Sequence, residues 1–152
     1  MEFKPVVFSV GDEEYGVDIN IVRGIEKAIP IVSMPNSNST IKGIINLRGD
    51  IIPIFSLRRK FNLPDASNQE NTQFIIVKTD KLNIGLEVDS VGDIQNVEEN
   101  QIFEMPKVLQ TEETKYYGDV INMNGRLVIM LDINQIMSNA EFDALEASIS
   151  KM

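Results

Sequence analysis

Two segments of the sequence recur in the same order, and this repetition limits the fold more than any single motif does. GVDINIVRGI (residues 16–25) matches GLEVDSVGDI (85–94) at an offset of 69 residues. INLRGDIIPIFSL (45–57) matches INMNGRLVIMLDI (121–133) at an offset of 76. Glycine and apolar positions coincide in both pairs. A chain with two such copies is expected to build one structural unit twice.

The difference between the two offsets indicates a longer connector in the second copy. Seven additional residues are expected within 95–116, which contains EEN, Met105-Pro106 and QTEETK, stretches typical of loops. The polar, proline-containing stretch 62–72 is expected to join the two copies.

The apolar residues predict an all-β chain. Short runs rich in Val and Ile are separated by turn residues, as in small β domains. The clearest hairpin joins residues 44–47 to 51–57 through Arg48-Gly49, where Gly49 supplies the positive φ that a two-residue turn requires. Pro53 lacks a backbone N–H, which predicts a sheet edge or a bulge in the second strand.

The C-terminal segment SNAEFDALEASISKM differs in kind. Ser138 and Glu141 have the spacing of a capping box, and Phe142, Leu145 and Ile149 recur at helical intervals. This pattern predicts a C-terminal helix that packs its apolar stripe on a β-barrel. A helix that binds a partner is the alternative.

The composition excludes most catalytic and metal-binding chemistry. The 152 residues include neither Cys nor His, which removes disulfides, thiolate metal sites and the commonest catalytic base. We expect no enzyme activity and no cofactor or metal site. The remote alternative is a carboxylate-dependent hydrolase in which Asp89 and Asp132 converge with raised pKa values. Otherwise Asp132 is expected at a strand end, where it accepts backbone hydrogen bonds.

The charge is acidic and unevenly distributed. A net charge of −9 argues against binding to nucleic acid, which requires clustered basic residues. Residues 1–62 carry a net charge of +1 and residues 63–152 carry −10. This asymmetry would favour contacts between unlike halves of neighbouring molecules, although a solvated acidic surface is the simpler explanation. No apolar run has the length of a signal peptide or a membrane span, so neither export nor membrane insertion is expected.

The tripeptide Arg48-Gly49-Asp50 invites comparison with integrin ligands. Such a ligand requires an exported protein and an accessible loop, whereas this sequence predicts a tight turn and no export. A rigid hairpin that holds Arg48 outward would lose little entropy when it binds a partner. From this stretch alone, a partner contact and a solvated turn charge remain equal alternatives.

The segment IKGIINLRGDIIPIFSL (41–57) resembles the hallmark of the CheW-like domain, the coupling module of bacterial chemotaxis. VVFSVGDEEYGVDI, FIIVKTDKLNIGLEVDSVGDI and YYGDVINMNGRLVIMLDINQIM extend the resemblance over nearly the whole chain. It implies two pseudo-repeated five-stranded SH3-like β-barrels with a C-terminal α-helix. We therefore expect a single CheW-like domain over 1–152. Its expected parts are a first barrel mainly in 15–70, a second barrel mainly in 72–137, terminal segments exchanged between the barrels, and a helix over 139–150.

The resemblance also implies a function. Stand-alone members of this family are non-enzymatic adaptors that bind the cytoplasmic tip of methyl-accepting chemoreceptors and the regulatory domain of a CheA-type histidine kinase. Receptor state then controls kinase autophosphorylation, and CheW-like domains alternate in rings beneath the receptor array. A cytoplasmic protein recruited beneath the inner membrane follows from this resemblance. An adaptor for another output, such as twitching, is the alternative.

The same resemblance implies which residues contact partners. Arg48, within the Asn-Leu-Arg-Gly segment, looks like a residue needed for coupling, and a groove between the barrels is expected to take a receptor helix hairpin. Gly24 departs from the family's usual Glu, and Glu26 is the neighbouring candidate to replace it. Ser56 replaces a usual Asp, which puts strand-end hydrogen bonding in doubt. The expected protein-binding residues are Val22, Gly24, Ile25, Gly43, Asn46, Arg48, Gly49, Val91 and Ile94.

Overall fold

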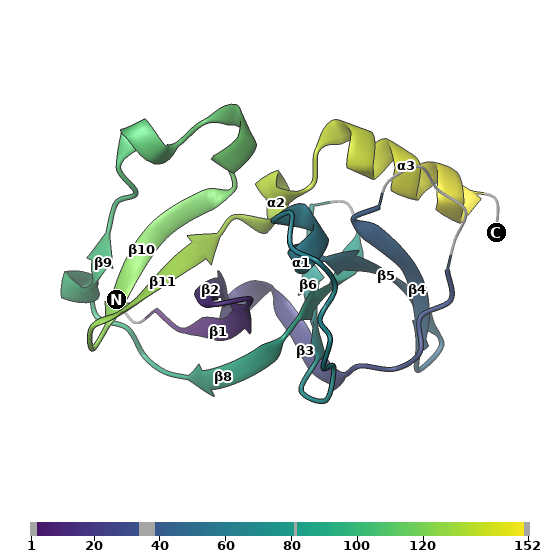
Figure 1. Ribbon diagram of the computed structural model, residues 1–152, viewed down its shortest axis with the longest axis horizontal. Coiled ribbons are helices and arrows are strands. Elements are labelled where there is room, and N and C mark those ends of the chain that lie inside the picture. Colours follow the sequence, from purple (N-terminus) through teal and green to yellow (C-terminus); the bar gives the residue numbers. More distant parts are fainter. Residues whose placement is uncertain (1–2, 34–38, 81, 151–152) are drawn as a thin grey trace.

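Two β-sheets form the body of the molecule in the computed structural model, which describes residues 3–33, 39–80 and 82–150 (Figure 1). The five-stranded sheet has the order β3-β6-β7-β5-β4, and the six-stranded sheet has the order β8-β1-β2-β11-β10-β9. The strands are β1 Pro5–Val10, β2 Glu13–Asp18, β3 Val22–Lys27, β4 Ile41–Leu47, β5 Asp50–Ser56, β6 Gln73–Lys78, β7 Asn83–Val88, β8 Ser90–Ile94, β9 Ile102–Phe103, β10 Tyr117–Met123 and β11 Arg126–Leu131. The helices are α1 Leu57–Lys60, α2 Ile133–Ile136 and α3 Asn139–Ser150, with 3-10 turns η1 Ile19–Ile21, η2 Glu99–Gln101, η3 Lys107–Leu109 and η4 Glu112–Thr114.

Each sheet combines strands from both sequence repeats. The hairpin β1–β2 of the first copy pairs with β8 and β11 of the second, and the hairpin β6–β7 of the second copy pairs with β3 and β5 of the first. In the two parallel ladders, Gly16 faces Met130 and Gly85 faces Ile54. These pairs are related by the same offsets of 69 and 76 residues that relate the sequence segments. The repeat is therefore structural, and its two copies exchange their first hairpins.

The division of the chain between the sheets differs from the expected ranges 15–70 and 72–137. Residues 73–88 lie in the five-stranded sheet, because the hairpin β6–β7 pairs there with β3 and β5. Residues 5–18 lie in the six-stranded sheet for the corresponding reason. The exchange therefore involves a whole hairpin from each copy.

One sheet has six strands where five were expected. The additional strand β9 belongs to the longer connector, and its Phe103 pairs with Val120 of β10. At the equivalent place in the first copy, Val32 forms an isolated bridge with Ile44. The same contact thus exists in both halves, and the longer connector extends it into a short strand.

The proline of the β4–β5 hairpin lies where β5 is paired on one side only. Pro53 lies in β5, which is flanked by β7 and β4, and it pairs with Ile44 without a register shift at that position. The parallel ladder between β5 and β7 begins one residue later, at Ile54. At Pro53 the strand β5 therefore has a local edge on the side of β7, as the missing N–H predicts, and no bulge.

A shared apolar core joins the two sheets, and each sheet also has an inner core of its own. The shared core contains buried residues from both sheets and from the C-terminal region, including Phe8, Phe55, Leu86 and Ile136. Burying each such side chain stabilises the fold by about 1.5–3 kcal/mol. The inner core of the six-stranded sheet contains Val7, Val97, Ile121, Met123, Val128 and Met130, and that of the five-stranded sheet contains Ile45, Ile52, Ile54, Phe74 and Ile76.

The C-terminal helix is capped as the sequence predicts. The backbone N of Glu141 donates to Ser138 Oγ (3.1 Å), and the backbone N of Ser138 donates to Glu141 Oε1 (2.8 Å). Phe142 and Leu145 are buried in the shared core, so this part of the stripe serves packing. The side chain of Ile149 lies outside the described part of the structure.

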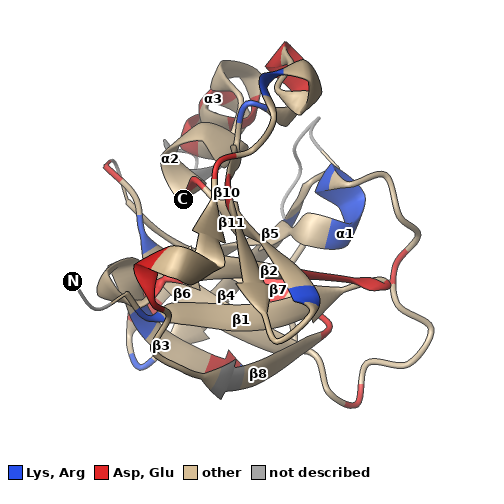
Figure 2. Cartoon of the chain, turned by 90° about the vertical axis from the view of Figure 1, so that its left-hand side faces the viewer, with Lys and Arg blue, Asp and Glu red and all other residues tan. Residues whose placement is uncertain are grey.

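Glu141 also fastens α3 to the rest of the fold. Lys60, at the end of the basic helix α1 (Figure 2), donates to Glu141 Oε1 at 2.7 Å, and Thr40 donates to Oε2. Burial alone would raise the pKa of Glu141, but the hydrogen bonds from Lys60, Ser138 and Thr40 outweigh it and leave the pKa below its ordinary value. The ionised carboxylate is therefore the form that the folded state stabilises.

We expect Glu141→Gln to lower the free energy of unfolding by about 2–3 kcal/mol at pH 7, because the ammonium of Lys60 then lacks its buried counterion. The folded-state pKa of Glu141 is depressed, so its stabilising contribution is full above the unfolded value and is lost as the pH falls. Urea denaturation should therefore show the difference in the free energy of unfolding between wild type and variant narrowing as the pH falls below about 4.3, the ordinary pKa of a glutamate. Asp143→Asn, at an exposed position of the same helix, is the control, and an equal loss in both variants would contradict the role of Glu141.

Candidate functional site

The hairpin turn that displays Arg48 has the geometry of a two-residue type I′ turn. Arg48 and Gly49 both have positive φ angles, 50° and 94°. Asn46 Oδ1 accepts a hydrogen bond from the backbone N of Gly49 at 2.9 Å. The second copy repeats this turn with Asn124 (φ 58°) and Gly125 (φ 92°).

The two turns share their supporting hydrogen bond as well as their backbone. Asn122 Oδ1 accepts from the backbone N of Gly125 at 2.8 Å, as Asn46 Oδ1 does from Gly49. The turn is therefore a structural device common to both copies. The side chain at its first position is what differs, since Arg48 corresponds to Asn124.

Arg48 is exposed and held by one carboxylate. Its side chain is 73% exposed, and its guanidinium donates to Glu26 Oε1 at 2.8 Å. Glu26 lies in β3, two residues after Gly24, and its Oε1 lies 3.4 Å from the place that a Cβ at Gly24 would occupy. An exposed pair of this kind is worth at most about 1 kcal/mol, so it orients Arg48 more than it stabilises the fold.

Gly43 is buried and acts through close packing. A Cβ atom at this position would lie 2.1 Å from the carbonyl oxygen of Val32 and 2.9 Å from a methyl group of Ile31. The absence of a side chain lets residues 31–32 lie directly over β4. Gly43 therefore shapes the surface without being exposed on it.

The strand ends after the two hairpins are capped in equivalent ways. Ser56 Oγ accepts from the backbone N of Arg59 (3.2 Å) and begins α1, while Asp132 Oδ1 accepts from the backbone N of Asn134 (3.1 Å) and begins α2. Ser56 therefore performs the strand-end hydrogen bonding that its departure from the family pattern had put in doubt. Asp132 has the structural role that the sequence predicts.

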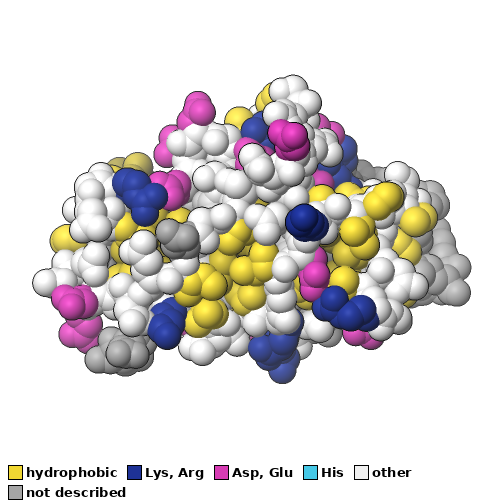
Figure 3. All heavy atoms as spheres, turned by 90° about the horizontal axis from the view of Figure 1, so that it is seen from below, with side chains coloured by type: hydrophobic (Ala, Val, Ile, Leu, Met, Phe, Trp, Pro, Cys, Tyr) yellow, Lys and Arg dark blue, Asp and Glu magenta, His cyan; other side chains and the backbone are white. Residues whose placement is uncertain are grey.

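The receptor groove is expected to be lined by Val22, Ile25, Val91 and Ile94. The first two occupy the positions in the first copy that the last two occupy in the second. The four residues lie on β3 and β8, the outer strands that pair with β6 and β1 (Figure 1). Figure 3 shows that apolar side chains gather on the face seen from below. Three of the four residues are half-buried against the shared core, and Ile94 is 45% exposed. Their pairing partners are Val77 for Val22, Ile75 for Ile25, Phe8 for Val91 and Val6 for Ile94.

Two apolar surface patches were not identified from the sequence. The Val32 patch consists of Val32, Ile44 and Ile51 on the outer face of β4 and β5, and the Phe103 patch consists of Phe103, Val120, Leu127 and Leu109. The members Val32, Ile44 and Ile51 correspond to Phe103, Val120 and Leu127 through the repeat. An apolar cleft of about 480 Å³ lies at the Phe103 patch. Exposed apolar surface of this kind is typical of docking sites. In the sequence, the two patches could have been found from the apolar residues Ile51 and Leu127, which occupy equivalent positions of the repeat.

The acidic residues considered for hydrolysis have structural partners. Arg58 donates to both carboxylate oxygens of Asp89 at 2.8 and 2.7 Å, and the backbone N of Gly11 donates to Oδ2 at 2.8 Å. Burial would raise the pKa of Asp89, but these hydrogen bonds lower it below its ordinary value, the opposite of what a general acid requires. In the described ranges, no group of three or more acidic side chains is placed to hold a metal ion.

The glycines of the β4–β5 hairpin are expected to respond differently to substitution. Gly43→Ala should cost about 3 kcal/mol or more, because the new methyl group would overlap the Val32 carbonyl. Gly49→Ala should cost about 1 kcal/mol, since only the positive φ opposes it and the space around it is open. Urea denaturation of both variants measures the difference. Equal costs would show that the packing of residues 31–32 over β4 is looser than described.

Comparisons with known proteins agree with this geometry. The family model of the CheW-like domain matches residues 4–141. The chain is 34% identical to the chemotaxis protein CheW of Klebsiella aerogenes over 96% of its own length and 87% of that protein, and 30% identical to CheW of Bacillus subtilis over 88% and 86%. The crystal structure of the scaffolding protein TtCheW from Thermoanaerobacter tengcongensis is similar, with a TM-score of 0.82 and 31% identity, over 92% of this chain and 96% of that one. The chain therefore belongs to the CheW-like domain family.

Proposed function

We propose that this chain holds a chemoreceptor and a CheA-type kinase on separate surfaces of one rigid domain. As a member of the CheW-like domain family it is a chemotaxis adaptor that couples receptors to CheA, and it is not an enzyme. We further propose which partner domains it binds and which of its surfaces bind them. This proposal rests most on Arg48, an exposed cation displayed by a turn whose second copy has the same backbone without that charge.

The proposed receptor surface combines the Arg48 hairpin with the apolar residues of β3 and β8. Val22, Ile25, Val91 and Ile94 offer partly exposed apolar area to the apolar face of a helix hairpin at the cytoplasmic tip of a methyl-accepting chemoreceptor. Arg48, oriented by its ion pair, would meet a carboxylate or carbonyl at the edge of that contact. Gly43 contributes indirectly, because it sets the position of the neighbouring segment.

The proposed kinase surfaces are the Val32 patch and the Phe103 patch. The kinase's regulatory domain is itself CheW-like, so each patch can meet a homologous partner. Because the patches are equivalent in backbone but not identical in side chains, contact between unlike patches is heterologous and can close into rings. Contacts of this transient kind bury about 1,200 Å² or less, so the affinity of an array would come from many weak contacts.

The adaptor is proposed to act in the cytoplasm, beneath the inner membrane, where receptor tips recruit it. In the described part of the chain, no helix is long and apolar enough to span a membrane. Recruitment through the receptor is proposed as its route to the membrane. A small movement of the receptor tip would then change which kinase arrangement the adaptor favours.

Arg48→Glu is expected to abolish most receptor control of kinase autophosphorylation. The assay combines the full chain, receptor cytoplasmic fragments and cognate kinase, and measures phosphate incorporation from labelled ATP. Because Arg48 is exposed and its pair with Glu26 is weak, the free energy of unfolding should stay within about 1 kcal/mol of wild type. Asn124→Glu, at the equivalent turn position of the second copy, is the matched control and should retain control of the kinase. Equal activity of Arg48→Glu and wild type would overturn the role of Arg48.

Phe103→Glu and Val32→Glu are each expected to weaken binding of the kinase regulatory domain by about tenfold or more, since both place a charge at the centre of a proposed contact. Isothermal titration calorimetry with the isolated regulatory domain measures the change. Receptor-fragment binding should be unaffected, and Gln110→Glu, an exposed change in the same connector, should leave both affinities unchanged. Unaltered kinase binding in both apolar variants would exclude these patches.

A further inference from the structure

The strand pairing of the two copies differs at Gly43 and at its equivalent in the second copy, Asp119. In the five-stranded sheet, the pairing of β4 with β5 resumes at Gly43, which faces Ile54. In the six-stranded sheet the equivalent residues are Asp119 and Met130, but the pairing of β10 with β11 resumes only at Val120. Asp119 is therefore outside the regular ladder.

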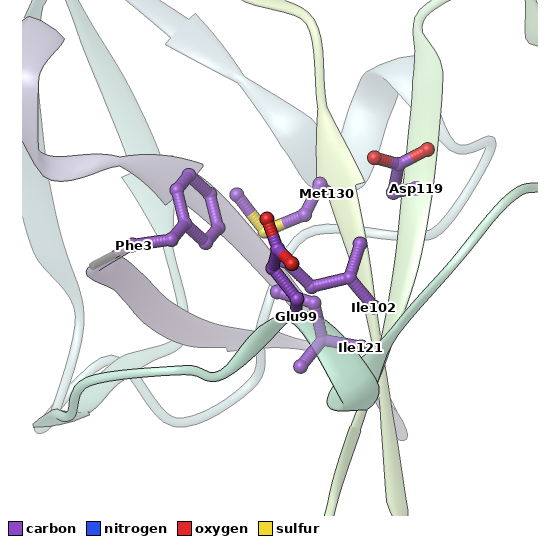
Figure 4. A pocket seen from close by; sticks show the side chains of 6 residues that line it. All are labelled: Phe3, Glu99, Ile102, Asp119, Ile121 and Met130. Carbon is purple, nitrogen blue, oxygen red and sulfur yellow. The ribbon is translucent and has the colours of Figure 1, made fainter. Parts of the chain in front are cut away.

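This departure coincides with an open cavity. In the first copy, the segment 31–32 covers Gly43 so closely that no Cβ would fit there. In the second copy, Asp119 is exposed, and a cavity of about 270 Å³ extends toward the inner core of the six-stranded sheet. Its lining consists of Phe3, Glu99, Ile102, Asp119, Ile121 and Met130 (Figure 4).

The lining combines an apolar floor with two carboxylates. The side chains of Ile102, Ile121 and Met130 belong to, or pack against, the inner core. Glu99 comes from η2 and Asp119 from β10, so two separate elements bring negative charge to one cavity (Figure 4). Within the described ranges, neither carboxylate has a hydrogen-bond donor or a basic partner. Asp89, by contrast, is paired with Arg58.

The size of the cavity suits a single long side chain. Its volume lies slightly below the roughly 300–1,000 Å³ of typical small-ligand pockets. Lysine and arginine bury their alkyl stems against apolar surface while the charged group stays near polar groups or water. The apolar floor matches such a stem, and the two unpaired carboxylates match its cation.

We propose that this cavity is a docking site for the side chain of a lysine or arginine from a partner protein. The alkyl stem lies on Ile102, Ile121 and Met130, and the cation lies between Glu99 and Asp119. The site is distinct from the Arg48 hairpin and from the Val32 patch, and it does not depend on the proposed placement of receptor and kinase.

Methyl NMR of the full chain, labelled at Ile and Met methyl groups, tests the site. The probes are N-acetyl-lysine N-methylamide and N-acetyl-arginine N-methylamide, with N-acetyl-norleucine N-methylamide as the neutral control and n-butylammonium as a free amine. We expect the lysine or arginine probe to cause saturable shifts at Ile102, Ile121 and Met130, and the norleucine probe to cause none. Ile45, Ile52 and Ile54, in the inner core of the other sheet, should not shift with any probe.

The double substitution Glu99→Gln/Asp119→Asn should weaken binding of the basic probes about fivefold or more, because it removes both charges and keeps similar shapes. Asp143→Asn, an exposed change on α3, should leave binding unchanged, and unaltered Ile45, Ile52 and Ile54 signals report that the double variant is folded. The proposal is overturned by an absence of saturable shifts, by equal binding of the norleucine probe, or by full binding to the double variant. Tighter binding of n-butylammonium than of both basic probes would assign the site to a free amine instead.

Discussion

The parallel pairing of β2 with β11 and of β7 with β5 holds the molecule together. Each ladder joins an exchanged hairpin to a strand of the other copy, so neither sheet is complete without both copies. Gly16 and Gly85 make these contacts close, since a Cβ at either position would lie 2.8 Å from Met130 Sδ or 2.7 Å from Ile54 Cδ1. The shared core then fills the space between the sheets. The exchange therefore fixes the two halves relative to each other.

The duplicated backbone provides the frame, and a few unequal side chains give the halves different surfaces. The two hairpin turns have almost the same φ angles and the same Asn hydrogen bond, yet only the first presents an arginine. Gly43 closes one half where Asp119 leaves the other open. Val32 and Phe103 occupy equivalent places and differ in size. An adaptor that must distinguish homologous partners gains specificity from such differences.

The sequence predicts those features that depend on local chemistry. Gly49 and the apolar alternation around it identify the hairpin, and Ser138 with Glu141 identifies the helix start, because both rest on contacts within a few residues. The repeat alone could not predict which hairpins are exchanged, since it shows which segments correspond but not which copy each pairs with. The Arg48–Glu26 ion pair could not be predicted either, because its two residues lie 22 positions apart in the sequence. The cavity at Asp119 appears only once the ladder's irregularity is known.

Simultaneous binding is the property that an adaptor with separate receptor and kinase surfaces must have. Sedimentation equilibrium of the full chain mixed with a receptor cytoplasmic fragment and a kinase regulatory domain measures it directly. Separate surfaces predict a ternary complex in which each partner retains its affinity for the chain within about threefold when the other is present, a coupling free energy below about 1 kcal/mol. Displacement of one partner by the other, with only binary complexes at saturation, would contradict separate surfaces on one rigid domain.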